Sequence, residues 1–77
     1  MEVLQMIVYA PFWNTLHTSE ESTYTLIKKH RISSSTIDKL RKNKPLNTTT
    51  VNDLCRILKC RVEDVMEYVP SHDDQLL

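Results

Sequence analysis

The residues of this chain best suited to chemistry are its cations, and they are gathered in one short window. Seven of the ten Lys and Arg residues lie between positions 28 and 44, and Asp38 is the one acid among them, so this window carries +6. The seven are Lys28, Lys29, Arg31, Lys39, Arg41, Lys42 and Lys44. The whole chain is neutral at pH 7, so its other residues sum to −6. This separation of charge predicts a negatively charged partner at the window.

The other residues that could do chemistry form no recognisable set. Cys55 and Cys60 are not a CxxC pair and the three histidines are scattered, whereas zinc sites show tighter paired spacing. Cys55 lies among apolar residues, where a thiol packs as a small hydrophobe. A phosphate-binding loop needs glycine, and the chain has none. We therefore predict no metal, cofactor, small-molecule substrate or catalytic residue, and an enzyme is the weakest of the functions considered.

Length and composition are those of one small domain. A chain of 77 residues buries only about 60% of the surface that its unfolded form exposes, so a dimer would add stability. No apolar run approaches the ~20 residues of a membrane span, and the first residues lack the basic start of a signal peptide. We expect a cytoplasmic protein with no membrane partner, folded over residues 1–70 and ending in a flexible tail, 71–77.

Apolar spacing and capping residues predict an all-α fold of five helices. Four are expected over residues 11–17, 23–30, 34–42 and 48–59, and a one-turn fifth at Val62–Met66. Helix starts are marked by Pro11, Ser22, Ser33 and Asn47. Short extended pieces, Ile7–Tyr9 and Glu67–Val69, flank this helical set, and we hypothesise that they pair as a two-stranded ribbon.

The helix expected over 34–42 presents polar residues on its outer side. Ile32 and Ile37 form a hydrophobic staple around the cap, and Ile37 marks the inner side. Ser34, at the leading edge, and Ser35, Asp38, Lys39 and Lys42 on the outer side remain for a ligand. Two helices joined by a short turn are the layout of helix-turn-helix readers, whose second helix enters the major groove.

Each of these outer residues has a possible role in such a reader and a simpler one. Lys39 can donate to guanine and Asp38 can accept from cytosine, while Arg41, Lys42 and Lys44 lie at the far end, where phosphates are expected. Equally, Ser34 and Ser35 can be solvated first-turn residues and Asp38 can pair only with Lys42. The sequence leaves both possibilities open.

Residues 22–69 resemble the Cro and phage-repressor type of helix-turn-helix domain, also called the XRE family. The likeness is carried by the order and spacing of Leu26, Ile27, Ile32–Ile37, Leu40, Val51, Leu54, Cys55, Leu58 and Cys60–Met66. Tyr9–Trp13 is similar to the start of small stand-alone members. The resemblance implies a compact lambda-repressor-like domain with base-reading positions at Ser34, Ser35 and Lys39. It implies phosphate contacts at Thr23, Asn43 and Lys44.

The leading hypothesis is therefore a homodimeric, sequence-specific transcriptional regulator that binds a double-stranded DNA operator, with repression as its expected action. The competing hypothesis is a protein-interaction module on the same fold, such as an antitoxin or accessory factor. The serines at the reading positions, where relatives often carry Gln, and the neutral net charge favour this second hypothesis.

Arg31 stands where relatives often place a glycine in the left-handed region. A residue with a Cβ costs about 1 kcal/mol in that conformation. Either the turn is built differently or the strain is accepted, in which case the Arg31 side chain is expected to point toward a phosphate. Asn43 stands at a second such position, and asparagine tolerates the conformation.

Overall fold

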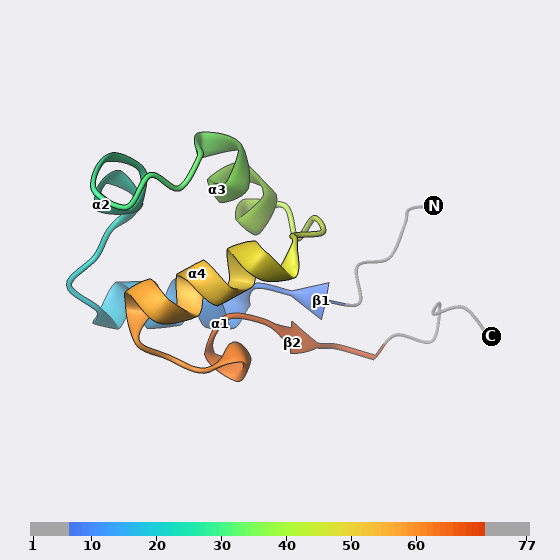
Figure 1. Ribbon diagram of the computed structural model, residues 1–77. Helices are drawn as coiled ribbons and strands as arrows, with labels where there is room; N and C mark the ends of the chain where they lie inside the picture. Colours follow the sequence, from blue (N-terminus) through green and yellow to red (C-terminus); the bar gives the residue numbers. More distant parts are fainter. Residues whose placement is uncertain (1–6, 71–77) are drawn as a thin grey trace.

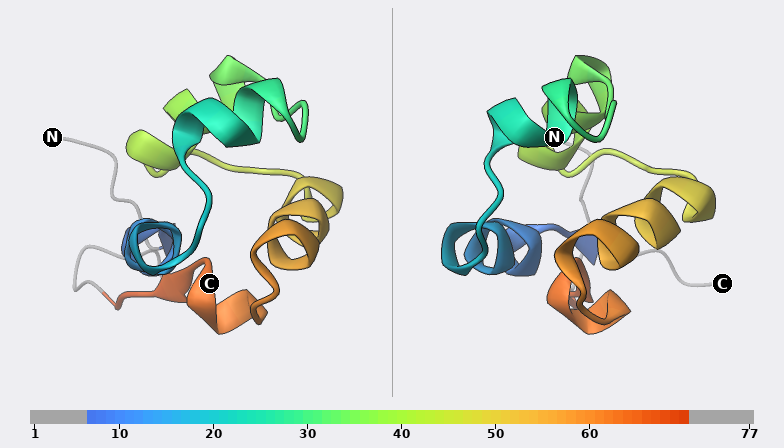
Figure 2. Two further views of the ribbon diagram at one scale, coloured as in Figure 1. Left: turned by 90° about the vertical axis from the view of Figure 1, so that its left-hand side faces the viewer. Right: turned by 60° about the vertical axis from the view of Figure 1, so that its left-hand side comes forward.

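The computed structural model describes residues 7–70, which form four α-helices, one 3₁₀ turn and a two-stranded sheet (Figure 1). In chain order these are β1 (Ile7–Val8), α1 (Ala10–Thr18), α2 (Thr23–Lys28), α3 (Ser34–Arg41), α4 (Thr48–Leu58), the 3₁₀ turn η1 (Val62–Asp64) and β2 (Glu67–Tyr68). The α2–α3 pair lies on one side of the molecule and η1 on the opposite side (Figure 2). The N-terminal residues 1–6 and the predicted tail, 71–77, lie outside the described residues.

The predicted starts of α2 and α3 are confirmed, whereas α1 begins at Ala10, one residue before the predicted start, and local chemistry explains all three. Pro11 lies in the first turn of α1, where its missing N–H would be unpaired anyway. Ser22 and Thr25 form a reciprocal capping box at α2, and the Ser33 hydroxyl accepts the Thr36 N–H at 3.1 Å at α3. Asn47 precedes α4 as predicted, but its side chain makes no capping hydrogen bond.

One core joins the helices and the C-terminal segment. Its fully buried side chains are Phe12, Leu26, Ile37, Leu40, Leu54 and Val65. Each α-helix supplies at least one of them, and Val65 follows η1 directly. The inner side predicted for α3 is thereby confirmed, because Ile37 and Leu40 both lie in the core.

The prediction of five helices was wrong in its last element, because the fifth is only the three-residue 3₁₀ turn η1. Groups from α1 take the carbonyls at its end: the Phe12 N–H donates to Val65 O at 3.2 Å and the Thr15 hydroxyl to Asp64 O at 2.8 Å. Those carbonyls are then already paired with partners outside the segment. The chain turns away into β2 instead of continuing a helix.

The hypothesised ribbon is confirmed over two residues on each side. β1 and β2 pair antiparallel, with Ile7 opposite Tyr68 and Val8 opposite Glu67. An isolated pair of strands this short is marginal in water, but here the next residue after β1, Tyr9, is buried in the core. None of the helices within residues 7–70 is long and apolar enough to cross a membrane.

Candidate nucleic-acid interface

The outward side of α3 carries the four predicted base-reading residues together. Ser34, Ser35, Asp38 and Lys39 are all exposed, while Ile37 on the opposite side is only 2% exposed. The Ser33 hydroxyl is committed to the helix start and lies 3.4 Å from the Ser35 hydroxyl. The tip of α3 is therefore a small hydroxyl surface that lets another molecule approach the backbone closely.

Asp38 and Lys42 form the ion pair that the sequence left open as the simpler role. The carboxylate and ammonium lie 3.1 Å apart one turn along α3, and both side chains are more than half exposed. Such a pair contributes only a few tenths of a kcal/mol, so either partner can exchange it for a ligand at little cost. Lys39 has no ion-pair partner within residues 7–70, which leaves its ammonium available on the outward side.

Arg41 is held at the end of α3 by an aromatic ring of α1. Its guanidinium carbon lies 5.8 Å from the centre of the Trp13 ring, and the Trp13 indole N–H donates to the Leu40 carbonyl at 3.4 Å. A cation–π contact at an exposed site is worth about 0.5–1 kcal/mol. This contact restricts the conformations of Arg41 before any ligand binds. Nothing in the local sequence pairs Trp13 with α3.

The loop after α3 is fastened to the start of α1. Asn43 adopts the left-handed conformation (φ 55°), as its position suggested, and the Lys44 N–H closes the helix end on the Lys39 carbonyl at 2.9 Å. Tyr9 donates its backbone N–H to Asn43 Oδ1 at 2.9 Å and its hydroxyl to the Lys44 carbonyl at 2.7 Å. The oxygen of Asn43 is therefore engaged within the fold, a role that the sequence did not reveal.

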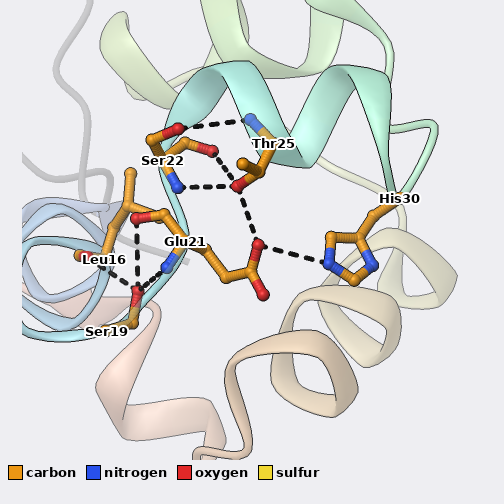
Figure 3. Close-up of polar contacts among 6 residues, drawn as sticks. All are labelled: Leu16, Ser19, Glu21, Ser22, Thr25 and His30. Atoms are coloured by element: carbon orange, nitrogen blue, oxygen red, sulfur yellow. Dashed lines mark hydrogen bonds and ion pairs between the residues drawn. The ribbon is translucent and has the colours of Figure 1, made fainter.

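The start of α2 is anchored to the turn that follows it by the carboxylate of Glu21 (Figure 3). One oxygen of Glu21 accepts the Thr25 hydroxyl at 2.7 Å and lies 3.3 Å from His30 Nε2. These contacts, led by the hydrogen bond from Thr25, lower the pKa of Glu21. Thr23, the predicted phosphate contact, is therefore the first residue of a short helix whose two ends are tied together.

Arg31, in the turn between α2 and α3, accepts the backbone strain. Its φ is 62°, in the left-handed region, while the Ile32 N–H beside it bonds the Leu26 carbonyl at 2.9 Å. Of the two possibilities that the sequence allowed, the turn keeps the shape that usually holds glycine. The Arg31 side chain is exposed next to the start of α3.

Comparison with known proteins places the helix pair in a family. A model of the Cro/C1-type helix-turn-helix DNA-binding domain matches residues 12–71. The chain belongs to this family. The structure is similar to the crystal structure of the transcriptional regulator VanUg, form II, with a TM-score of 0.76 and 27% identity over 92% of this chain and 100% of that chain. No match was found among curated proteins.

The cysteines of this Cro/C1-type domain serve packing. Both are free thiols, half-buried at the end of α4, and the Cys60 N–H donates to the Cys55 carbonyl at 3.0 Å. Burial, with smaller contributions from Cys55 and Asp64, raises the pKa of Cys60 to about 11. A thiol with that pKa stays protonated at neutral pH and is a poor nucleophile.

Arg31→Gly is expected to raise the free energy of unfolding of this Cro/C1-type domain by up to about 1 kcal/mol, because glycine adopts positive φ without the clash of a Cβ. If the guanidinium contacts a phosphate, the same variant loses affinity for every DNA duplex. Its plot of log affinity against log salt then becomes shallower by about 0.9. Urea unfolding and DNA titrations at several salt concentrations measure the two effects.

Lys59→Gly is the matched control. Lys59 also has a positive φ, 56°, but it caps the end of α4 and is not part of the turn between α2 and α3. This variant removes one cation and the same kind of strain, so it should be stabilised without losing affinity for DNA. Equal losses of affinity in both variants would show that Arg31 acts only through net charge.

Proposed function

We propose that this protein is a sequence-specific DNA-binding transcriptional regulator, acting as a repressor, that reads the major groove with α3. The observation that carries the proposal is the exposed outward side of α3, with hydroxyls at its tip and behind them Lys39, which has no ion-pair partner among residues 7–70. The family supports DNA as the ligand, and the similarity to VanUg supports regulation of transcription as the role. Such a protein works in the cytoplasm, where its operator is accessible.

The proposed contacts divide into two groups along the helix pair. Ser34, Ser35, Asp38 and Lys39 meet base edges, because recognition helices present their N-terminal residues to the groove floor. The groups that meet phosphates surround them: Thr23 at the start of α2, Arg31 in the turn, and Arg41, Lys42, Asn43 and Lys44 at the end of α3. Because Asn43 Oδ1 accepts from Tyr9, its amide nitrogen is the group left to donate to a phosphate.

We further propose that the regulator binds as a homodimer. An eight-residue recognition helix makes only a few base contacts, and a second copy on a two-fold operator doubles them. In dimeric readers of this type the two half-sites lie about 34–36 Å apart, one turn of the double helix. The two copies then place their α3 helices in two successive major grooves on the same side of the DNA.

A salt titration with generic duplex DNA tests the proposal. We expect measurable binding at about 50 mM salt. The logarithm of the affinity should fall linearly with the logarithm of the salt concentration, with a slope near −0.9 for each phosphate neutralised. Enrichment of random duplexes should return a two-fold sequence, and sedimentation should give two protein copies for each duplex. An absence of binding at low salt would remove the DNA proposal and leave the protein-interaction module.

A further inference from the structure

Tyr9 connects the terminal ribbon to the end of the recognition helix. Tyr9 is 3% exposed. It forms hydrogen bonds with two consecutive residues of the loop after α3, Asn43 and Lys44, which follow it in the chain by 34 and 35 positions. Its own carbonyl accepts the Trp13 N–H at 3.3 Å, at the start of α1. Three groups of one residue therefore join β1, α1 and this loop.

Of the two bonds, one holds the Asn43 side chain and the other holds the Lys44 carbonyl, so the loop backbone is fixed more firmly than by the helix end alone. Lys44 has one backbone bond back to α3, from its N–H to the Lys39 carbonyl at 2.9 Å. The Tyr9 hydroxyl takes the carbonyl of the same residue at 2.7 Å, so both peptide groups that flank the Lys44 side chain are held. Burial raises the pKa of the Tyr9 phenol, so it remains a proton donor at neutral pH.

We propose that Tyr9 is a positioning residue for DNA binding, which holds the Lys44 backbone so that the Lys44 ammonium meets a phosphate without first being ordered. The proposal rests on the proposed function. It assigns the start of α1 a part in DNA affinity, although Tyr9 itself is buried and touches no DNA. Ordering a flexible side chain or loop on binding reduces affinity, and an anchored backbone avoids part of that loss.

The test is a double-mutant cycle in DNA binding with Tyr9→Phe and Lys44→Ala. Tyr9→Phe keeps the buried ring and removes the hydroxyl, and Lys44→Ala removes the ammonium but keeps the carbonyl. Alone, Tyr9→Phe should lower affinity for all duplexes about two- to tenfold, the range of one hydrogen bond, and make the salt slope shallower. In the Lys44→Ala background it should change affinity by less than about twofold. Effects that multiply in the double variant would overturn the proposal.

Thr15→Val is the matched structural control. The Thr15 hydroxyl donates to the Asp64 carbonyl at 2.8 Å, a bond of the same kind that links α1 to η1 rather than to α3. The variant should lose stability but keep the wild-type affinity and salt slope when measured on folded protein, as shown by circular dichroism. If wild-type protein binds DNA and Tyr9→Phe matches Thr15→Val, the positioning role is wrong. If wild-type protein does not bind, the proposed function itself fails.

Discussion

Replacing Ile37 by alanine is expected to lower the free energy of unfolding by about 2–5 kcal/mol, the range for a buried Ile or Leu cut back to Ala. Ile37 is 2% exposed and is, with Leu40, one of the two buried residues of α3. Small domains have stabilities of only about 5–15 kcal/mol, and this one lies near the lower size limit. The variant should therefore lose a large part of its stability and populate unfolded protein near 37 °C.

Urea unfolding followed by the single tryptophan measures this effect, because Trp13 lies against the end of α3. Affinity for DNA should fall with the folded fraction, and saturating DNA should recover part of the lost stability, since a ligand of the folded state shifts the equilibrium toward it. Val62→Ala is the control, because Val62 is an aliphatic residue that is 50% exposed. An Ile37→Ala variant as stable as Val62→Ala would mean that α3 does not depend on the core.

Local signals explain why so much of this fold could be predicted from the sequence. Ser22 and Ser33 each hydrogen-bond to the turn that follows them, so the starts of α2 and α3 are encoded within three residues. The outward side of α3 follows from helical periodicity once Ile37 is placed inward. The ribbon was recognised because two short β-prone pieces lay at opposite ends of the helical set, although its two-residue length depends on packing.

The contacts that the sequence did not reveal join residues far apart in the chain. Tyr9 meets Lys44 across 35 positions and Trp13 meets Leu40 across 27, and no spacing rule connects such pairs. The fifth helix was overpredicted because apolar spacing at Val62–Met66 suits a helix. Donors from α1, which only the fold brings near, take the carbonyls that a longer helix would use. For Arg31, the sequence allowed either a different turn or a strained residue, and the structure has the strained residue, with a positive φ.

Lys39→Ala and Lys44→Ala are expected to weaken DNA binding in different ways. Lys39 lies on the outward side of α3, one turn after Ser35, so its loss should reduce discrimination at one base pair by about 1–3 kcal/mol, or roughly 5- to 150-fold. Lys44 lies beyond the end of α3, where a phosphate is the expected partner. Its loss should weaken all duplexes alike and make the salt slope shallower by about 0.9.

Binding to the enriched operator and to a set of single base-pair variants separates the two outcomes. Both lysines are exposed and neither contributes to the core, so each alanine variant should keep wild-type stability within about 0.5 kcal/mol. For each protein we compare the affinity for the operator with the affinity for each base-pair variant. Major-groove reading by α3 predicts that Lys44→Ala leaves this ratio at the wild-type value for every variant, and that Lys39→Ala brings it close to one at a single position. If both variants lose affinity equally for all duplexes, Lys39 contacts the DNA phosphate backbone. The base sequence is then recognised by the serines at the tip of α3 or through the shape of the DNA.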